Sequence, residues 1–100
     1  MAILEIVEPH RLGQEEALRR IKGEIAQALR MFSDKISDFK ENWKDNKGNM
    51  SFSFQGFTFN CNLTVTPSQV ITKTDVPFIV MMFKGKIEEV IRPAIRKILA

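Results

Sequence analysis

Few residues in this chain have the type and spacing that catalysis requires. His10 is the only histidine and lies beside Pro9 in a connection, and a lone surface histidine is typically incidental. Cys61 is the only cysteine and falls on the dry face of an alternating strand, where a thiol behaves as a small hydrophobic group. Glu88 and Glu89 are adjacent, so on a helix their side chains diverge by about 100° and do not share a site. We therefore expect a protein that is not an enzyme, with no catalytic residue, no metal site and no cofactor.

One segment raises the alternative of RNA binding. Gly56-Phe57-Thr58-Phe59 is similar to the core of an RNA-recognition motif, whose aromatic rings stack on bases. That fold interleaves helices with strands, however, whereas four predicted strands run together here. Phe57 and Phe59 would also share the face that the helices must cover. We therefore expect no nucleic-acid partner.

The composition indicates one soluble domain spanning residues 1–100. Of the 100 residues, 44% are apolar and 27% are charged, as in ordinary globular proteins. Basic and acidic residues are interspersed, so the formal charge of +3 describes a solvated surface. No apolar run reaches the roughly 18 residues of a transmembrane segment, and the first ten residues lack a basic leader, so we expect a cytoplasmic protein. Any ligand pocket should be small in a chain of this size.

The first third of the chain predicts a strand and a helix. Ile3–Glu8 is rich in Ile and Val and ends at Pro9, which is typical of a strand. Gly13 and the acidic residues after it indicate a helix start, and the helix should end near residues 33–34. Its apolar stripe contains Leu18, Ile21, Ile25, Ala28, Leu29 and Phe32. Its exposed face should carry two ion pairs four residues apart, Glu15 with Arg19 and Glu16 with Arg20.

Four strands are predicted next, separated by turns at residues 45–49, 55–56 and 67–69. The clearest is Phe57–Thr66, where apolar and polar residues alternate strictly, so that one face is dry and the other wet. The others are Ile36–Trp43, which has the most ambiguous pattern, Met50–Phe54 and Val70–Val76.

The last quarter of the chain, Phe78–Leu99, predicts one amphipathic helix on a hydrophobic platform. Its apolar stripe contains Val80, Phe83, Ile87, Val90, Ile91, Ala94, Ile95 and Ile98. The charged side should lie in water and carries Lys84, Lys86, Glu88, Glu89, Arg92, Arg96 and Lys97. Pro93 removes a backbone N–H, so we expect a kink there, and a helix broken in two at Arg92 is the alternative.

The order of strand, helix, four strands and helix predicts the α+β class. Consecutive strands with short turns imply an antiparallel four-stranded meander, and helices at both ends imply a curled sheet with both helices on one face.

Short segments throughout the chain match one family. They are residues 10–17 (HRLGQEEA), Trp43, Phe52-Ser53-Phe54, Leu63-Thr64-Val65, Val76-Pro77-Phe78, residues 83–88 (FKGKIE) and Lys97-Ile98-Leu99. On these segments the chain resembles the polyhydroxyalkanoic acid system family of small bacterial proteins, whose name associates them with storage-polyester granules. The resemblance implies a small α+β domain linked to polyester metabolism, and it carries over no catalytic residue. The architecture is also similar to a reduced helix-grip fold, in which a curled sheet holds a long terminal helix.

Together the residues and the resemblance predict a binding module. It would hold a hydroxyacyl or other apolar ligand between the sheet and the terminal helix, in a pocket lined by Phe59, Leu63, Phe83 and Ile87. The alternatives are a protein–protein interaction domain and a protein attached to a polyester granule through exposed apolar surface. A small enzyme is the rival class, which the lack of paired titratable groups disfavours. The sequence does not specify an oligomeric state.

Overall fold

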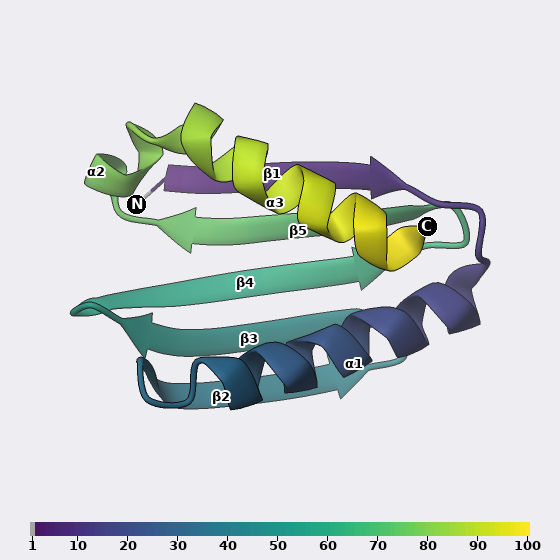
Figure 1. Cartoon of the computed structure of the whole chain (residues 1–100), viewed down its shortest axis with the longest axis horizontal. Coiled ribbons are helices and arrows are strands. Elements are labelled where there is room, and N and C mark those ends of the chain that lie inside the picture. The colour runs from purple at the N-terminus through teal and green to yellow at the C-terminus, as the bar shows by residue number, and fades with distance from the viewer. Residues whose placement is uncertain (1) are drawn as a thin grey trace.

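The computed structural model describes residues 2–100 and consists of an open five-stranded antiparallel sheet with three helices. The two long helices, α1 and α3, lie on the same face of the sheet (Figure 1). This confirms the predicted α+β class and the predicted side for the helices. The elements are β1 (Ala2–Pro9), α1 (Gln14–Met31), β2 (Ile36–Lys44), β3 (Lys47–Phe54), β4 (Phe57–Val65), β5 (Gln69–Val76), α2 (Phe78–Met81) and α3 (Lys84–Leu99).

The strand order β1-β5-β4-β3-β2 contains the predicted meander of β2 to β5 and adds β1 beside β5. The turn between β3 and β4 is Gln55-Gly56, with φ of 54° and 80°, and such left-handed backbone angles match the twist of a two-residue hairpin. The turn predicted at residues 45–49 is wrong in length, because β3 already begins at Lys47 and only Asp45-Asn46 form the turn. β2 has an irregularity between Ser37 and Lys40, which explains why its sequence does not alternate cleanly.

The two faces of the sheet differ as the alternation in β4 predicts. Cys61, Leu63 and Val65 are buried, whereas Asn60 and Asn62 are exposed on the outer face. The main core is a cluster of buried residues at the sheet, beneath the first half of α1 and the end of α3. It contains Ala17, Ile21, Leu63, Val65, Val70 and Leu99.

The long helices touch at one end and diverge toward the other (Figure 1). At the closed end Arg20 of α1 donates hydrogen bonds to the backbone oxygens of Ile98 at 3.1 Å and Ala100 at 2.6 Å. These bonds satisfy carbonyls that the end of a helix leaves unpaired. Away from this contact the predicted stripe of α1 is only partly covered, because Ala28 and Phe32 are exposed. Of the two ion pairs predicted on α1, Glu16 with Arg20 is present. The pair of Glu15 with Arg19 is wrong, because Arg19 binds Glu16 instead.

The predicted single helix over Phe78–Leu99 is wrong, because the chain breaks into α2 and α3 at Met82 and Phe83. The N–H of Phe83 donates to the oxygen of Val80 at 2.9 Å, a three-residue spacing that ends the first helix in a tight turn. α3 then continues without interruption through Pro93, so the alternative break at Arg92 is also wrong. The break turns Phe83 out of the predicted stripe and into solvent, and Val90 is exposed as well.

Candidate functional site

An apolar pocket of about 420 Å³ lies between the sheet and the diverging helix α3. Its floor is built from helix-facing residues of four strands, namely Leu4, Met50, Phe52, Phe54, Phe59, Cys61, Thr72, Thr74 and Val76. Its wall comes from Val80 of α2 with Ile87 and Ile91 of α3. The rings of Phe52 and Phe59 stack across β3 and β4 with their centroids 5.4 Å apart, which stiffens the floor. The volume lies within the usual range of small-ligand sites, roughly 300 to 1,000 Å³.

None of the residues that line the apolar pocket is charged. Its polar groups are the hydroxyls of Thr72 and Thr74 and the thiol of Cys61. The hydroxyl of Thr74 donates a hydrogen bond to Cys61 Sγ at 3.5 Å. Burial raises the pKa of the Cys61 thiol, and the bond from Thr74 only partly opposes this rise. The thiol is therefore neutral and a poor nucleophile.

The structure brings together two of the four residues that the sequence nominated for a pocket. Phe59 lies in the floor and Ile87 in the wall. Leu63 is instead buried in the main core with Ala17 of α1, and Phe83 is exposed beyond the break between α2 and α3.

Sequence reasoning missed the contributions of β1, β3 and β5 to the pocket. Thr72 and Thr74 face the helices because they alternate with Ile71 and Lys73, in register with the buried Val70. This alternation of inward-facing and outward-facing residues along β5 can be predicted from the sequence. Leu4 could not have been placed, because the position of β1 beside β5 follows from no local pattern.

A second group of side chains holds α3 against β1, and the sequence placed its α3 members, Glu88, Arg92 and Arg96, on the helix side that faces water. Glu8 is buried and accepts hydrogen bonds from Arg92 Nη1 at 3.1 Å and from Arg96 Nε at 3.0 Å. Arg92 also binds Glu88 at 2.7 Å. Burial alone would raise the pKa of Glu8, but the hydrogen bonds and charges of Arg96 and Arg92 outweigh it and lower that pKa below its ordinary value. Both carboxylate oxygens of Glu8 are therefore hydrogen-bonded, and we call Glu8, Arg92 and Arg96 the clasp.

His10 is buried, so its predicted surface position is wrong. Its Nδ1 accepts a hydrogen bond from the N–H of Leu12 at 3.2 Å, which leaves Nε2 to donate to the oxygen of Thr66 at 3.0 Å. Both ring nitrogens are therefore hydrogen-bonded: Nε2 joins the end of β1 to the turn before β5, and Nδ1 bonds locally within the connection that follows β1.

Trp43 packs directly on Gly48 at the other edge of the sheet. A Cβ added to Gly48 would lie 2.7 Å from the Trp43 ring, so only glycine fits there. The indole N–H donates to Glu41 Oε2 at 2.6 Å, and Lys22 Nζ of α1 lies 5.1 Å from the ring centroid, within the range of a cation–π contact. Trp43 thus ties β2 to both β3 and α1.

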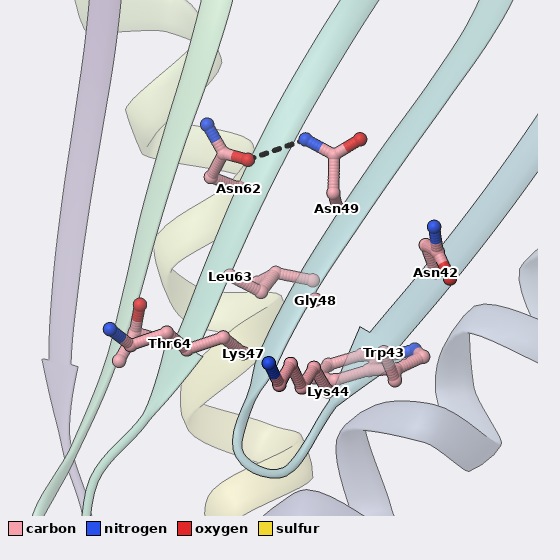
Figure 2. Close-up of a pocket in the computed structure, with 9 residues that line it drawn as sticks. All are labelled: Asn42, Trp43, Lys44, Lys47, Gly48, Asn49, Asn62, Leu63 and Thr64. Atoms are coloured by element: carbon pink, nitrogen blue, oxygen red, sulfur yellow. Dashed lines mark hydrogen bonds between the residues drawn. The ribbon is translucent and has the colours of Figure 1, made fainter.

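Figure 2 shows a second hollow beside the turn between β2 and β3, with a volume of about 570 Å³. Its polar side chains are Asn42, Lys44, Lys47, Asn49, Asn62 and Thr64. Asn49 Nδ2 donates to Asn62 Oδ1 at 2.6 Å, which joins β3 to β4. Asn49 and Asn62 are exposed, and so are Lys44 and Lys47, which flank the turn, so water solvates all four side chains. The apolar pocket is the better candidate site, because ligand sites are typically apolar with a few polar groups.

The fold and the pocket define a small α+β domain in which a sheet and a C-terminal helix enclose an apolar site. The chain belongs to the family described as "Putative polyhydroxyalkanoic acid system protein", whose family model matches residues 4–99. This match covers nearly the whole chain and confirms the family resemblance. No curated protein and no solved structure matches the chain. In the part of the chain that the structure describes, residues 2–100, no helix has the length and apolar character needed to cross a membrane.

Proposed function

We propose that this protein is a non-enzymatic binding domain that holds a hydroxyacyl or other acyl chain in the apolar pocket. The observation that carries the proposal is a pocket of about 420 Å³ whose lining contains no charged side chain. The family name concerns polyhydroxyalkanoic acid, so 3-hydroxyacyl chains are the first ligands to test.

The lining favours a particular orientation of the ligand. An alkyl chain would lie on the stacked rings of Phe52 and Phe59 and beneath Ile87 and Ile91. A charged carboxylate or thioester carrier would stay in solvent, because no cation lines the pocket to compensate its desolvation. The Thr72 hydroxyl on the floor is a suitable partner for a 3-hydroxyl or ester oxygen.

Affinity should come from the alkyl chain. Each buried methylene contributes about 0.8 kcal/mol, which corresponds to about fourfold in the dissociation constant. About eight methylenes would give about 6 kcal/mol before ordering costs, so medium-length chains should bind in the high micromolar to millimolar range.

A binding role, rather than catalysis, is supported by the state of the titratable groups near the pocket. The pKa of the Cys61 thiol is raised by burial, so its nucleophilic form is disfavoured. Glu8 and His10 are engaged in structural hydrogen bonds away from the pocket.

The proposal is tested by titrating fatty acids and 3-hydroxy fatty acids of increasing length while following backbone amide shifts by NMR. We expect saturable shifts at Phe59, Thr74 and Ile87, with affinity rising about fourfold per methylene until the pocket is full. Val65 in the main core should not shift.

Two neighbouring residues of α3 provide a matched pair of variants. Ile91→Ser changes the pocket wall and should weaken binding about tenfold or more, whereas Val90→Ser changes an exposed residue and should leave binding unchanged. Equal affinities in the two variants, or no saturable shift with any chain length, would refute the proposal.

A further inference from the structure

The segment around α2 exposes more apolar side chain than any other short stretch of the described residues. Phe78 is 70%, Ile79 60%, Met82 80% and Phe83 59% exposed. We call these four residues the α2 surface. Single exposed apolar residues are ordinary in soluble proteins, but four within six positions form a patch that marks an interaction site.

The fold itself prevents these side chains from turning inward. α2 has only four residues, and its inward positions are taken by Val80, which lines the apolar pocket, and by the half-buried Met81. The tight turn at Phe83 then ends the helix before a further turn could cover its outer side. In Figure 1, α2 projects at one corner of the molecule, beside the start of β1 and the end of β5.

The charges that follow the α2 surface in the sequence are basic, whereas the half-buried Asp75 precedes it at the end of β5. The sequence from Val76 to Ile87 contains no acidic residue, and Lys84 and Lys86 follow the patch directly, both exposed. The first acidic side chain after them, Glu88, is held by Arg92 at 2.7 Å, and Glu89 follows it on α3. An apolar projection with adjacent lysines combines the two features that bind proteins to anionic lipid surfaces.

A second copy of the chain fits this surface less well than a lipid does. With about 200 Å² for each large apolar side chain, the four exposures leave about 500 Å² uncovered, below the roughly 800 Å² per partner of a stable interface. A two-fold contact centred on α2 would also bring Lys84 and Lys86 close to their own copies, where like charges repel. The exposed Met31 and Phe32 do not extend the patch, because α1 lies across the width of the sheet from α2 (Figure 1).

We propose that the α2 surface docks the protein on an anionic lipid surface, with Phe78, Ile79, Met82 and Phe83 entering the interface and Lys84 and Lys86 contacting the headgroups. α3 stays packed against the sheet during docking, because the docking side chains are already exposed. This inference does not require the apolar pocket to bind a ligand, so the two proposals fail independently.

The test is flotation of the purified full chain with two kinds of vesicle, one of phosphatidylcholine alone and one of phosphatidylcholine mixed with phosphatidylglycerol. We expect the protein to float with the anionic vesicles, to bind neutral vesicles more weakly, and to be released from the anionic ones by added salt. Sedimentation velocity without lipid should show a monomer.

Three variants locate the binding. Phe78→Ser with Met82→Ser should lower anionic-vesicle binding at least tenfold, and Lys84→Gln with Lys86→Gln should lower it about fivefold for each lysine removed. Val90→Ser is the control, since Val90 is 66% exposed on α3 but lies outside the α2 surface, and it should bind as the parent does. Melting followed by circular dichroism should show that all three variants remain folded.

The proposal is overturned if the parent protein floats with neither vesicle, or if the Phe78 and Met82 variant binds as the parent does. It is also overturned if the parent dimerises without lipid and this variant is monomeric, because a second copy would then be the occupant.

Discussion

Leu63 and Thr64 are neighbours in β4 that face opposite sides of the sheet. Leu63 is buried against α1, whereas Thr64 is half-buried on the outer face. Leu63→Ala should lower the free energy of unfolding by about 2 to 5 kcal/mol, because it leaves a cavity in the core. Thr64→Ala should change it by less than about 1 kcal/mol. Urea denaturation of the two variants checks this, and a larger loss for Thr64→Ala would contradict the register of β4.

Residue-level prediction from sequence succeeded where one local pattern determined the outcome. The alternation in β4 correctly placed Cys61 and Leu63 on the helix-facing side. Sequence reasoning failed for His10, which it placed at the surface, because this buried ring binds a partner 56 positions away. From sequence alone a polar residue is predicted to be exposed, because the distant partner that allows its burial is not known.

At the scale of elements, α3 is attached to β1 by the clasp of Glu8 with Arg92 and Arg96. Because the pKa of Glu8 is lowered in the folded protein, the unfolded chain binds more protons in acid. The stabilisation is therefore present above the ordinary glutamate pKa of 4.5 and is lost as pH falls through the lower folded value. We expect the midpoint of urea unfolding to fall as pH is lowered below about 4.5.

Glu8→Gln isolates this contribution. The substitution should cost about 1.5 to 3 kcal/mol at neutral pH, because the charged hydrogen bonds of two solvent-accessible guanidinium groups to the buried carboxylate are lost, and it should flatten the acid limb of the stability profile. Glu16 also has a lowered pKa, of about 2, owing to its hydrogen bonds with Arg19 and Arg20, but it lies on the solvated side of α1. By the same linkage Glu16 also contributes to the acid limb, but exposed helix pairs contribute little to stability, so Glu16→Gln should flatten it less than Glu8→Gln does. An acid limb that is equally steep in Glu8→Gln and the parent would exclude the clasp as its cause.

The number and order of elements were largely predictable, but their ends and breaks were less so. Glycine, proline and asparagine marked the hairpins correctly, whereas the break at Met82 and Phe83 lies within an uninterrupted apolar run. An uninterrupted apolar run is compatible with a continuous helix, so the sequence does not show where α2 ends. In the structure, Val80 packs in the pocket wall and α2 ends at Met81. The same break explains why Phe83, which was predicted to line the pocket, lies outside it.

At the scale of the molecule, α2 and α3 complete a core that the sheet and α1 cannot close alone. Ile95, Ile98 and Leu99 pack on the main core, and Ile87 and Ile91 cover the pocket. Partial burial of five such side chains contributes roughly 5 to 10 kcal/mol, similar to the whole stability of a small domain. A chain truncated after Val76 should therefore show no cooperative thermal transition by circular dichroism, and a sharp transition would show that these helices are peripheral.

The pairing of β1 with β5 has a consequence for the order in which the protein folds. Neighbouring strands from β2 to β5 are joined by short turns, so each hairpin can close locally. β1 is made first, yet its register joins Ala2 to Val76 and Pro9 to Gln69, and this contact requires the closure of a long loop. During synthesis, β1 and α1 therefore have no sheet to pack against until most of the chain has been made. The clasp residues of α3 are made later still, so β1 can pair with β5 before Glu8 has its arginine partners.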